Sequence, residues 1–212
     1  MRKLAIKKVR HPEKIKDCQF LIVGRNSKKI FSYNYDNFKY FNELTYEELL
    51  KFDVGSINKL SRYGRRFINQ KKLENQRIPK LSELLEMSSK NKFKNLLINL
   101  EIKSTPDEEN LTPAPEDTVK LVVNEINKSN LKDQIIVSSF DWRTLTEIKN
   151  QYPEISRAYL TYQQVKGMKI KKTIYNRSPW MSFLPFYEDH ELPKIIKSQG
   201  GKAWHPYRKD IT

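Results

Sequence analysis

The sequence has little cysteine and no long apolar run, and each shortage excludes a class of protein. Cys18 is the single cysteine among 212 residues, so the chain can form no internal disulfide and no cluster of thiolate ligands. No window approaches the roughly 18 consecutive apolar residues that a transmembrane helix needs. Residues 1–14 are charged and lack the apolar core of a signal peptide. We therefore expect a soluble protein in a reducing compartment, the cytoplasm.

Glycine is also scarce, which argues against nucleotide-binding folds. The chain has 6 glycines, and none forms the Gly-rich loop of a Rossmann or Walker site. Hydrophobic residues make up 38% and aromatic residues 11% of the sequence, which is enough to build a core around at least one sheet. We expect a single domain over residues 1–212.

Acidic residues are in deficit, with 25 Asp and Glu against 40 Lys and Arg, for a formal net charge of +15. Clustered basic residues would favour a nucleic-acid partner, because they bind phosphates with release of counterions. Basic runs occur at 62–72 and 166–172, but most lysines are scattered among Asn and Ile. That pattern is the bias of an AT-rich genome, and we favour this interpretation over attraction to anionic substrates, membrane surfaces or nucleic acid.

Apolar spacing predicts an alternation of strands and helices. Thr45 and Glu48 have the spacing of a capping box, which predicts a short helix at 45–52. Further helices are expected from 81 onward, at 115–129, at 141–153 and at 191–199; strands are expected at 20–23, 30–33, 95–102, 133–140, 155–162 and 202–206. Strand followed by helix implies parallel crossover units, and the leading architecture is an α/β barrel.

One acid and one base interrupt the apolar strand at 95–102. Strand alternation places Glu101 and Lys103 on one face. An acid at the C-terminal end of such a strand is either solvated or chemical, and chemistry in barrels lies at these ends. Ser138, Ser139 and Phe140 lie at a similar end, where strand-end packing is the preferred interpretation.

Five segments together resemble the glycerophosphodiester phosphodiesterase family; they lie at 44–56, 78–86, 96–103, 135–155 and 200–212. The resemblance implies a TIM-type (β/α) barrel. It also implies hydrolysis of lipid-derived glycerophosphodiesters to glycerol phosphate and an alcohol, with a divalent metal, Mg²⁺ or Ca²⁺. Glu101 matches a metal-binding glutamate and Lys103 a basic residue near the substrate phosphate, in keeping with the preference of hard cations for carboxylates. Trp204 is a candidate substrate contact at the barrel mouth.

The sequence departs from the family near its start. The family's His-Arg-Gly and Pro-Glu-Asn-Thr motifs have only fragments at 11–13, and residues 19–21 stand where a Glu-Leu-Asp strand would supply two metal ligands. Asn34 and Tyr35 stand at the family's His-Asp pair. Both catalytic histidines and two of three metal acids therefore lack counterparts, and no catalytic residue is assigned. His190, His205 and the acids at 107–109 are read as polar surface residues.

The given sequence ends with the residues KDIT at 209–212, where members of the family continue into a helix and a last strand. We therefore expect a barrel that is incomplete at both ends, with a companion chain as one way to complete it. The leading hypothesis is a family member that binds a glycerophosphodiester and hydrolyses it weakly or not at all. The alternative is a non-catalytic degenerate barrel or split-gene fragment that binds anionic headgroups; a basic nucleic-acid binder is less favoured.

Overall fold

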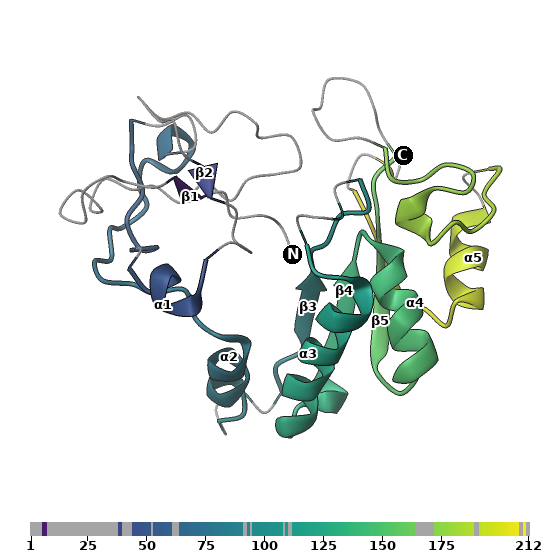
Figure 1. Cartoon of the computed structure of the whole chain (residues 1–212), viewed down its shortest axis with the longest axis horizontal. Coiled ribbons are helices and arrows are strands. Elements are labelled where there is room, and N and C mark those ends of the chain that lie inside the picture. Colours follow the sequence, from purple (N-terminus) through teal and green to yellow (C-terminus); the bar gives the residue numbers. More distant parts are fainter. Residues whose placement is uncertain are drawn as a thin grey trace. The chain divides into compact units, whose positions relative to one another are not determined.

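The computed structural model describes residues 6–7, 38–39, 44–51, 53–60, 64–90, 93, 95–107, 109, 112–163, 172–188, 191–207 and 210. The strands expected at 20–23 and 30–33 lie outside these residues, as do His11, His190, Glu108 and the positions aligned with the family's early motifs. The chain divides into two compact units, Arg2–Pro79 and Lys80–Thr212, and each is considered by itself (Figure 1).

In the unit Arg2–Pro79, two short strands and one capped helix are described. Strands β1 (Ile6–Lys7) and β2 (Phe38–Lys39) pair antiparallel. Helix α1 (Tyr46–Leu49) begins with the predicted capping box. The Thr45 hydroxyl accepts a hydrogen bond from the Glu48 N–H at 3.2 Å, and the Glu48 carboxylate accepts one from the Thr45 N–H at 2.9 Å. The capping-box prediction is confirmed.

Where the structure describes residues 54–77, they form a loop that is irregular apart from one 3₁₀ turn, η3 (Gly64–Phe67). A single carboxylate holds its two ends together. Asp53 accepts four hydrogen bonds at 2.9–3.2 Å, from the N–H groups of Gly55, Asn75 and Gln76 and the hydroxyl of Ser56. Burial raises the pKa of Asp53, but these hydrogen bonds outweigh it and leave the pKa below its usual value.

In the unit Lys80–Thr212, four parallel strands form one sheet in the order β3-β4-β5-β6. These strands are β3 (Ile98–Ile102), β4 (Ile135–Ser139), β5 (Ser156–Thr161) and β6 (Ala203–Pro206). The intervening helices are α3 (Pro115–Lys128), α4 (Trp142–Gln151) and α5 (Leu192–Ser198), with the 3₁₀ turns η6 (Lys132–Gln134) and η7 (Pro179–Met181); α2 (Leu81–Ser88) precedes the sheet. The predicted order of strand and crossover helix is confirmed.

Alternation along the strands assigns one face of the sheet to the helices. Ile102, Val137 and Tyr159 lie in one buried cluster with side chains of α3 and α4, and these two helices lie along the sheet in Figure 1. The apolar spacing of Val119, Val122, Val123 and Ile126 predicts the buried face of α3, and the structure confirms it: Val122 is partly buried against the core and the other three are fully buried. Helix α4 contributes Trp142, Leu145 and Ile148. The core therefore lies between the helices and this face, and the other face is left for Glu101 and its neighbours.

None of the helices described is long and apolar enough to cross a membrane.

Candidate functional site

The two charged residues singled out in the sequence lie together at the C-terminal end of β3. The Lys103 Nζ lies 3.0 Å from the Glu101 Oε2, and the two side chains keep 29% and 27% of their exposure, respectively. Both point away from the helix-facing side of the sheet, because they alternate with the buried Ile102. The structure thus places a salt bridge at the position where the sequence predicts a cation ligand and a phosphate contact.

The row of residues beside Glu101 runs across the whole described sheet. Glu101 pairs with Ser138, Ser138 with Ala158, and Ala158 with Ala203. Ser138 is fully buried, and its hydroxyl has no hydrogen-bond partner among the residues that the structure describes. His205 lies two residues beyond Ala203 on the same face, and two strands, β4 and β5, separate its strand from that of Glu101, at roughly 5 Å per strand spacing.

Trp204 lies on the helix-facing side, in register with Tyr159. Its indole Nε1 donates a hydrogen bond to the Thr161 hydroxyl at 2.9 Å, and its ring packs against the core. These contacts are those of a packed strand residue. A substrate contact of Trp204 stays a prediction.

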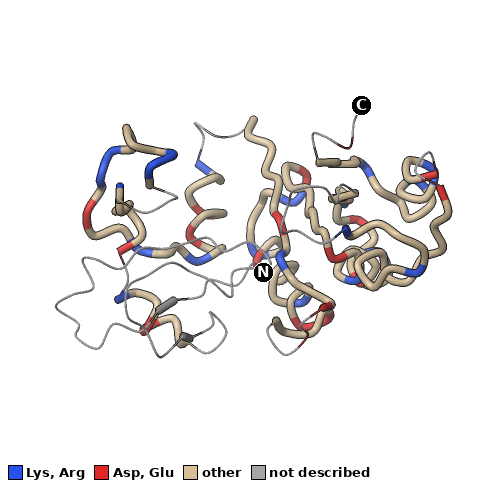
Figure 2. Tube along the Cα trace, turned by 90° about the horizontal axis from the view of Figure 1, so that it is seen from above, with Lys and Arg blue, Asp and Glu red and all other residues tan. Residues whose placement is uncertain are grey.

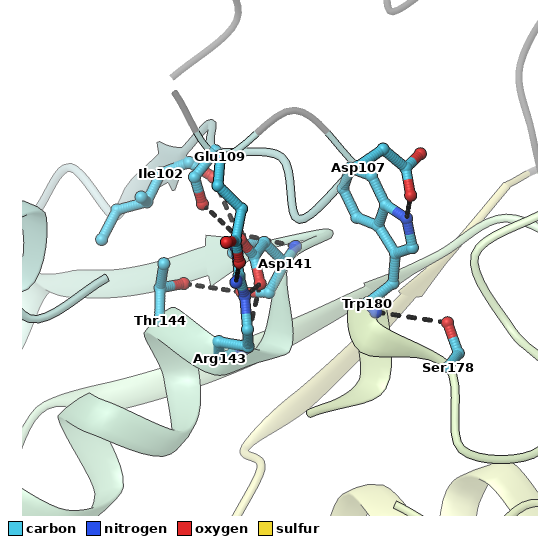
Figure 3. A network of polar contacts seen from close by, with 10 residues as sticks. Ile102, Asp107, Glu109, Asp141, Arg143, Thr144, Ser178 and Trp180 are labelled. Atoms are coloured by element: carbon cyan, nitrogen blue, oxygen red, sulfur yellow. Dashed lines mark hydrogen bonds and ion pairs between the residues drawn. The ribbon is translucent and has the colours of Figure 1, made fainter. Parts of the chain in front are cut away.

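A buried acid that the sequence did not single out organises the loop after β3 (Figure 3). Asp141 is the N-cap of α4 and is fully buried. Its Oδ1 accepts from the Arg143 N–H and Nε at 3.2 and 3.0 Å, and its Oδ2 accepts from the Ser104 hydroxyl and the Arg143 Nη2 at 2.8 and 2.9 Å. The hydrogen bond to Asp141 raises the pKa of Arg143 against the opposing effect of burial. Asp141 therefore holds Ser104, the residue next to Lys103.

Two further contacts fix the same loop. Arg143 Nη1 donates to the Glu109 carboxylate at 2.6 Å, and the Trp180 Nε1 donates to the Asp107 carboxylate at 3.1 Å. Asp107 and Glu109 were expected to be solvated, but each carboxylate accepts a hydrogen bond from another side chain (Figure 3). A local signal existed for Asp141, since Asp is a preferred N-cap, but nothing local indicated its distant partners.

A second group of buried polar atoms follows β5. Within the described ranges, Tyr162 OH, Gln163 Nε2 and Asp210 Oδ1 have no hydrogen-bond partner, while the Gln163 N–H donates to the Asp210 Oδ2 at 2.9 Å. Burial, with Tyr207 and Asp210 nearby, raises the pKa of Tyr162. No local feature of the sequence indicates this group, because Asp210 lies 47 residues beyond Gln163.

The residues described do not by themselves fit a divalent cation. Mg²⁺ and Ca²⁺ take at least six oxygen ligands; Ca²⁺ usually binds several carboxylates, and Mg²⁺ one or two together with waters. Glu101 supplies one carboxylate, which Lys103 already neutralises, and Asp141 is occupied by Arg143 and Ser104. Across the described ranges, no group of three or more His, Cys, Asp or Glu side chains could hold a metal ion.

Comparison with known proteins assigns the chain to a family. Residues 15–199 match the model of the glycerophosphoryl diester phosphodiesterase family, and the chain belongs to that family. A glycerophosphodiester phosphodiesterase of Caldanaerobacter subterraneus subsp. tengcongensis is 29% identical over 178 residues, which are 81% of this chain and 63% of the relative.

The structural comparison agrees. A crystal structure from Silicibacter pomeroyi DSS-3, assigned as a glycerophosphoryl diester phosphodiesterase, matches with a TM-score of 0.67 and 29% identity, covering 85% of this chain and 55% of that chain. The chain therefore spans less than two thirds of the length of both relatives. The expected TIM-type barrel fold is confirmed, and the sheet of described strands is not closed.

Proposed function

We propose that the chain is a glycerophosphodiester-binding member of the family whose hydrolysis in isolation is weak or absent. The observation that supports binding is the Glu101–Lys103 pair at the C-terminal end of β3, where barrel enzymes place their chemistry. Lys103 contacts the phosphate. Weak hydrolysis is supported by the position of His205, which is the single imidazole among the described residues and lies three strands away from the pair.

Charge explains why this site would use a cation. At rest, the ammonium of Lys103 neutralises the carboxylate of Glu101. When Lys103 turns to a phosphodiester, Glu101 faces a second anion at close range, and the site carries an excess negative charge. We propose that Glu101 then contacts Mg²⁺ or Ca²⁺, on which the family in general depends, with the remaining ligands supplied from outside the described residues.

Glu101→Gln is expected to raise the affinity for glycerophosphoglycerol about tenfold in metal-free buffer, because one negative charge near the bound phosphate is removed. The same variant is expected to lose any increase in affinity that Mg²⁺ or Ca²⁺ gives the unaltered chain. Isothermal titration with and without the metal measures both effects.

Glu125→Gln is the matched control, since Glu125 pairs with Lys128 on the surface of α3 at 2.6 Å. This variant should leave the affinity for glycerophosphoglycerol unchanged both with and without the metal. Glycerol phosphate release is assayed in parallel. Fast hydrolysis that disappears in Glu101→Ala would show a complete enzyme and overturn the proposal of weak activity, and a lower metal-free affinity of Glu101→Gln would overturn the assignment of Glu101.

A second candidate function, binding of anionic lipid headgroups, is favoured by residues 64–77. Residues 65–77 are all exposed and carry five basic side chains and one acidic one, Glu74; the basic ones are Arg65, Arg66, Lys71, Lys72 and Arg77 (blue in Figure 2). Three large apolar side chains of the same segment are exposed, namely Phe67 at 42%, Ile68 at 54% and Leu73 at 59%. Basic and apolar side chains in one exposed segment are typical of binding to an anionic membrane surface.

Replacing Arg65, Arg66, Lys71 and Arg77 together with Ser is expected to weaken binding to vesicles with anionic lipid at least a hundredfold, at about 1 kcal/mol per basic residue. Sedimentation with neutral and anionic vesicles measures the effect. A control variant removes four exposed lysines of the other unit, Lys120, Lys194, Lys197 and Lys202. Equal loss in both variants would indicate net charge alone, and salt-sensitive retention on DNA without vesicle binding would favour nucleic acid.

Three broader expectations remain proposals. We propose that residues 1–212 form one partial barrel domain, that a companion chain can complete it, and that the protein is cytoplasmic, the last because Cys18 is the single cysteine.

A further inference from the structure

Two adjacent serines at the end of β4 differ in the hydrogen bonding of their hydroxyl groups. Ser138 and Ser139 are both fully buried. Ser139 donates a hydrogen bond to the Ile102 carbonyl at 2.8 Å and accepts one from the Asp141 N–H at 3.0 Å. The Ser138 hydroxyl has no hydrogen-bond partner in the described part of the chain. A buried hydroxyl without a partner destabilises the fold, so its presence needs an explanation beyond packing.

Packing alone does not require a hydroxyl at this position. The row that contains Ser138 continues as Ala158 and Ala203 on the next two strands, so alanine is accommodated at the same level of the sheet. On its other side, Ser138 is the register neighbour of Glu101, about 4.8 Å away between strands. The unpaired hydroxyl therefore lies beside the charged pair, on the face opposite the helices.

We propose that Ser138 is a ligand-binding residue whose hydroxyl donates a hydrogen bond to a phosphoryl oxygen of the glycerophosphodiester that Lys103 contacts. This inference rests on the proposed function. A serine hydroxyl supplies a neutral, directional donor beside the diffuse charge of an ammonium. Phosphoryl oxygens are strong acceptors, and a hydrogen bond to a charged acceptor is stronger than one between neutral groups. The ligand thus satisfies a group that the fold leaves unsatisfied.

The test compares Ser138→Ala with Ser139→Ala. Ser138→Ala is expected to raise the thermal midpoint by a few degrees, because an unsatisfied group is removed, and to weaken glycerophosphoglycerol binding about tenfold or more. Ser139→Ala loses two hydrogen bonds and is expected to lower the midpoint while keeping the affinity within about twofold. Isothermal titration and thermal denaturation of the full chain provide both readouts.

The outcomes separate this inference from the proposed function. If the unaltered chain binds glycerophosphoglycerol and Ser138→Ala binds it equally well, the role of Ser138 is overturned and the proposed function stands. If Ser138→Ala lowers the midpoint as Ser139→Ala does, the hydroxyl is structural and the inference is overturned. If the unaltered chain does not bind glycerophosphoglycerol with or without Mg²⁺, both are overturned.

Discussion

Trp142→Ala is expected to lower the free energy of unfolding of the unit Lys80–Thr212 by about 3–5 kcal/mol. The Trp142 side chain is fully buried. Its ring meets the edge of Tyr159 at a centroid distance of 4.8 Å and an interplanar angle of 86°, and its Nε1 donates to the Leu160 carbonyl at 3.1 Å. Alanine would leave a large cavity between α4 and β5 and an unpaired carbonyl, which is why the expected loss is at the upper end for a core substitution.

Urea denaturation followed by circular dichroism measures this loss. Trp142→Phe keeps a ring in contact with Tyr159 and should cost clearly less, which provides a readable value if the alanine variant does not fold. Leu121→Ala on α3 is the control, because Leu121 is 64% exposed and should change stability by no more than about 0.5 kcal/mol. A loss below about 1 kcal/mol for Trp142→Ala would contradict the packing described for α4.

Arg143→Ala is expected to destabilise the same unit by about 3–5 kcal/mol, because it leaves the Asp141 carboxylate buried without its cation. Asp141 has 0% and Arg143 19% of the side chain exposed, and the guanidinium reaches both carboxylate oxygens. Arg143→Lys keeps the charge but not the planar fork of donors, so it should recover only part of the loss. Chemical denaturation of the three proteins gives the comparison.

The other ion pair of Arg143 serves as its control. Glu109 has 71% of its side chain exposed, and Glu109→Ala should cost about 1 kcal/mol or less, as exposed pairs do. The double variant Asp141→Asn with Arg143→Ala should lose less free energy of unfolding than the sum of the losses of the two single variants, since the buried charge is gone. Equal losses for Glu109→Ala and Arg143→Ala would show that burial of Asp141 is not what makes the pair strong.

Local features of the sequence predicted helix α1 and the strands and helices of the unit Lys80–Thr212. The Thr45–Glu48 spacing predicted the cap of α1 because both partners lie within one helical turn. The spacing of Val119, Val123 and Ile126 predicted the buried face of α3 because a helix repeats within the same stretch. Alternation along the strand predicted that Glu101 and Lys103 share a face. Each of these depends on neighbours a few residues away.

Features set by distant residues could not be predicted in this way. Ser104 and Asp141 are 37 residues apart, and Arg143 and Glu109 are 34 apart, so the network forms only once two crossover units pack together. Likewise, the side on which Trp204 lies depends on its register with Tyr159 of β5, which a four-residue strand does not reveal. The hydrogen bond from Ser139 to the Ile102 carbonyl has the same origin, because these two residues are 37 apart and lie on neighbouring strands.

The position of β3 in its sheet has a consequence for assembly. Of the strands described, β3 pairs with β4 alone, so one row of its backbone N–H and C=O groups faces away from the sheet. Such a margin is a template on which an extended segment, from this polypeptide or another, can add by backbone pairing. Charged side chains on an edge strand oppose its pairing with the edge strand of another molecule. We therefore expect the charges of Glu101 and Lys103 also to disfavour pairing of β3 between two copies of the chain, whether or not a ligand is bound.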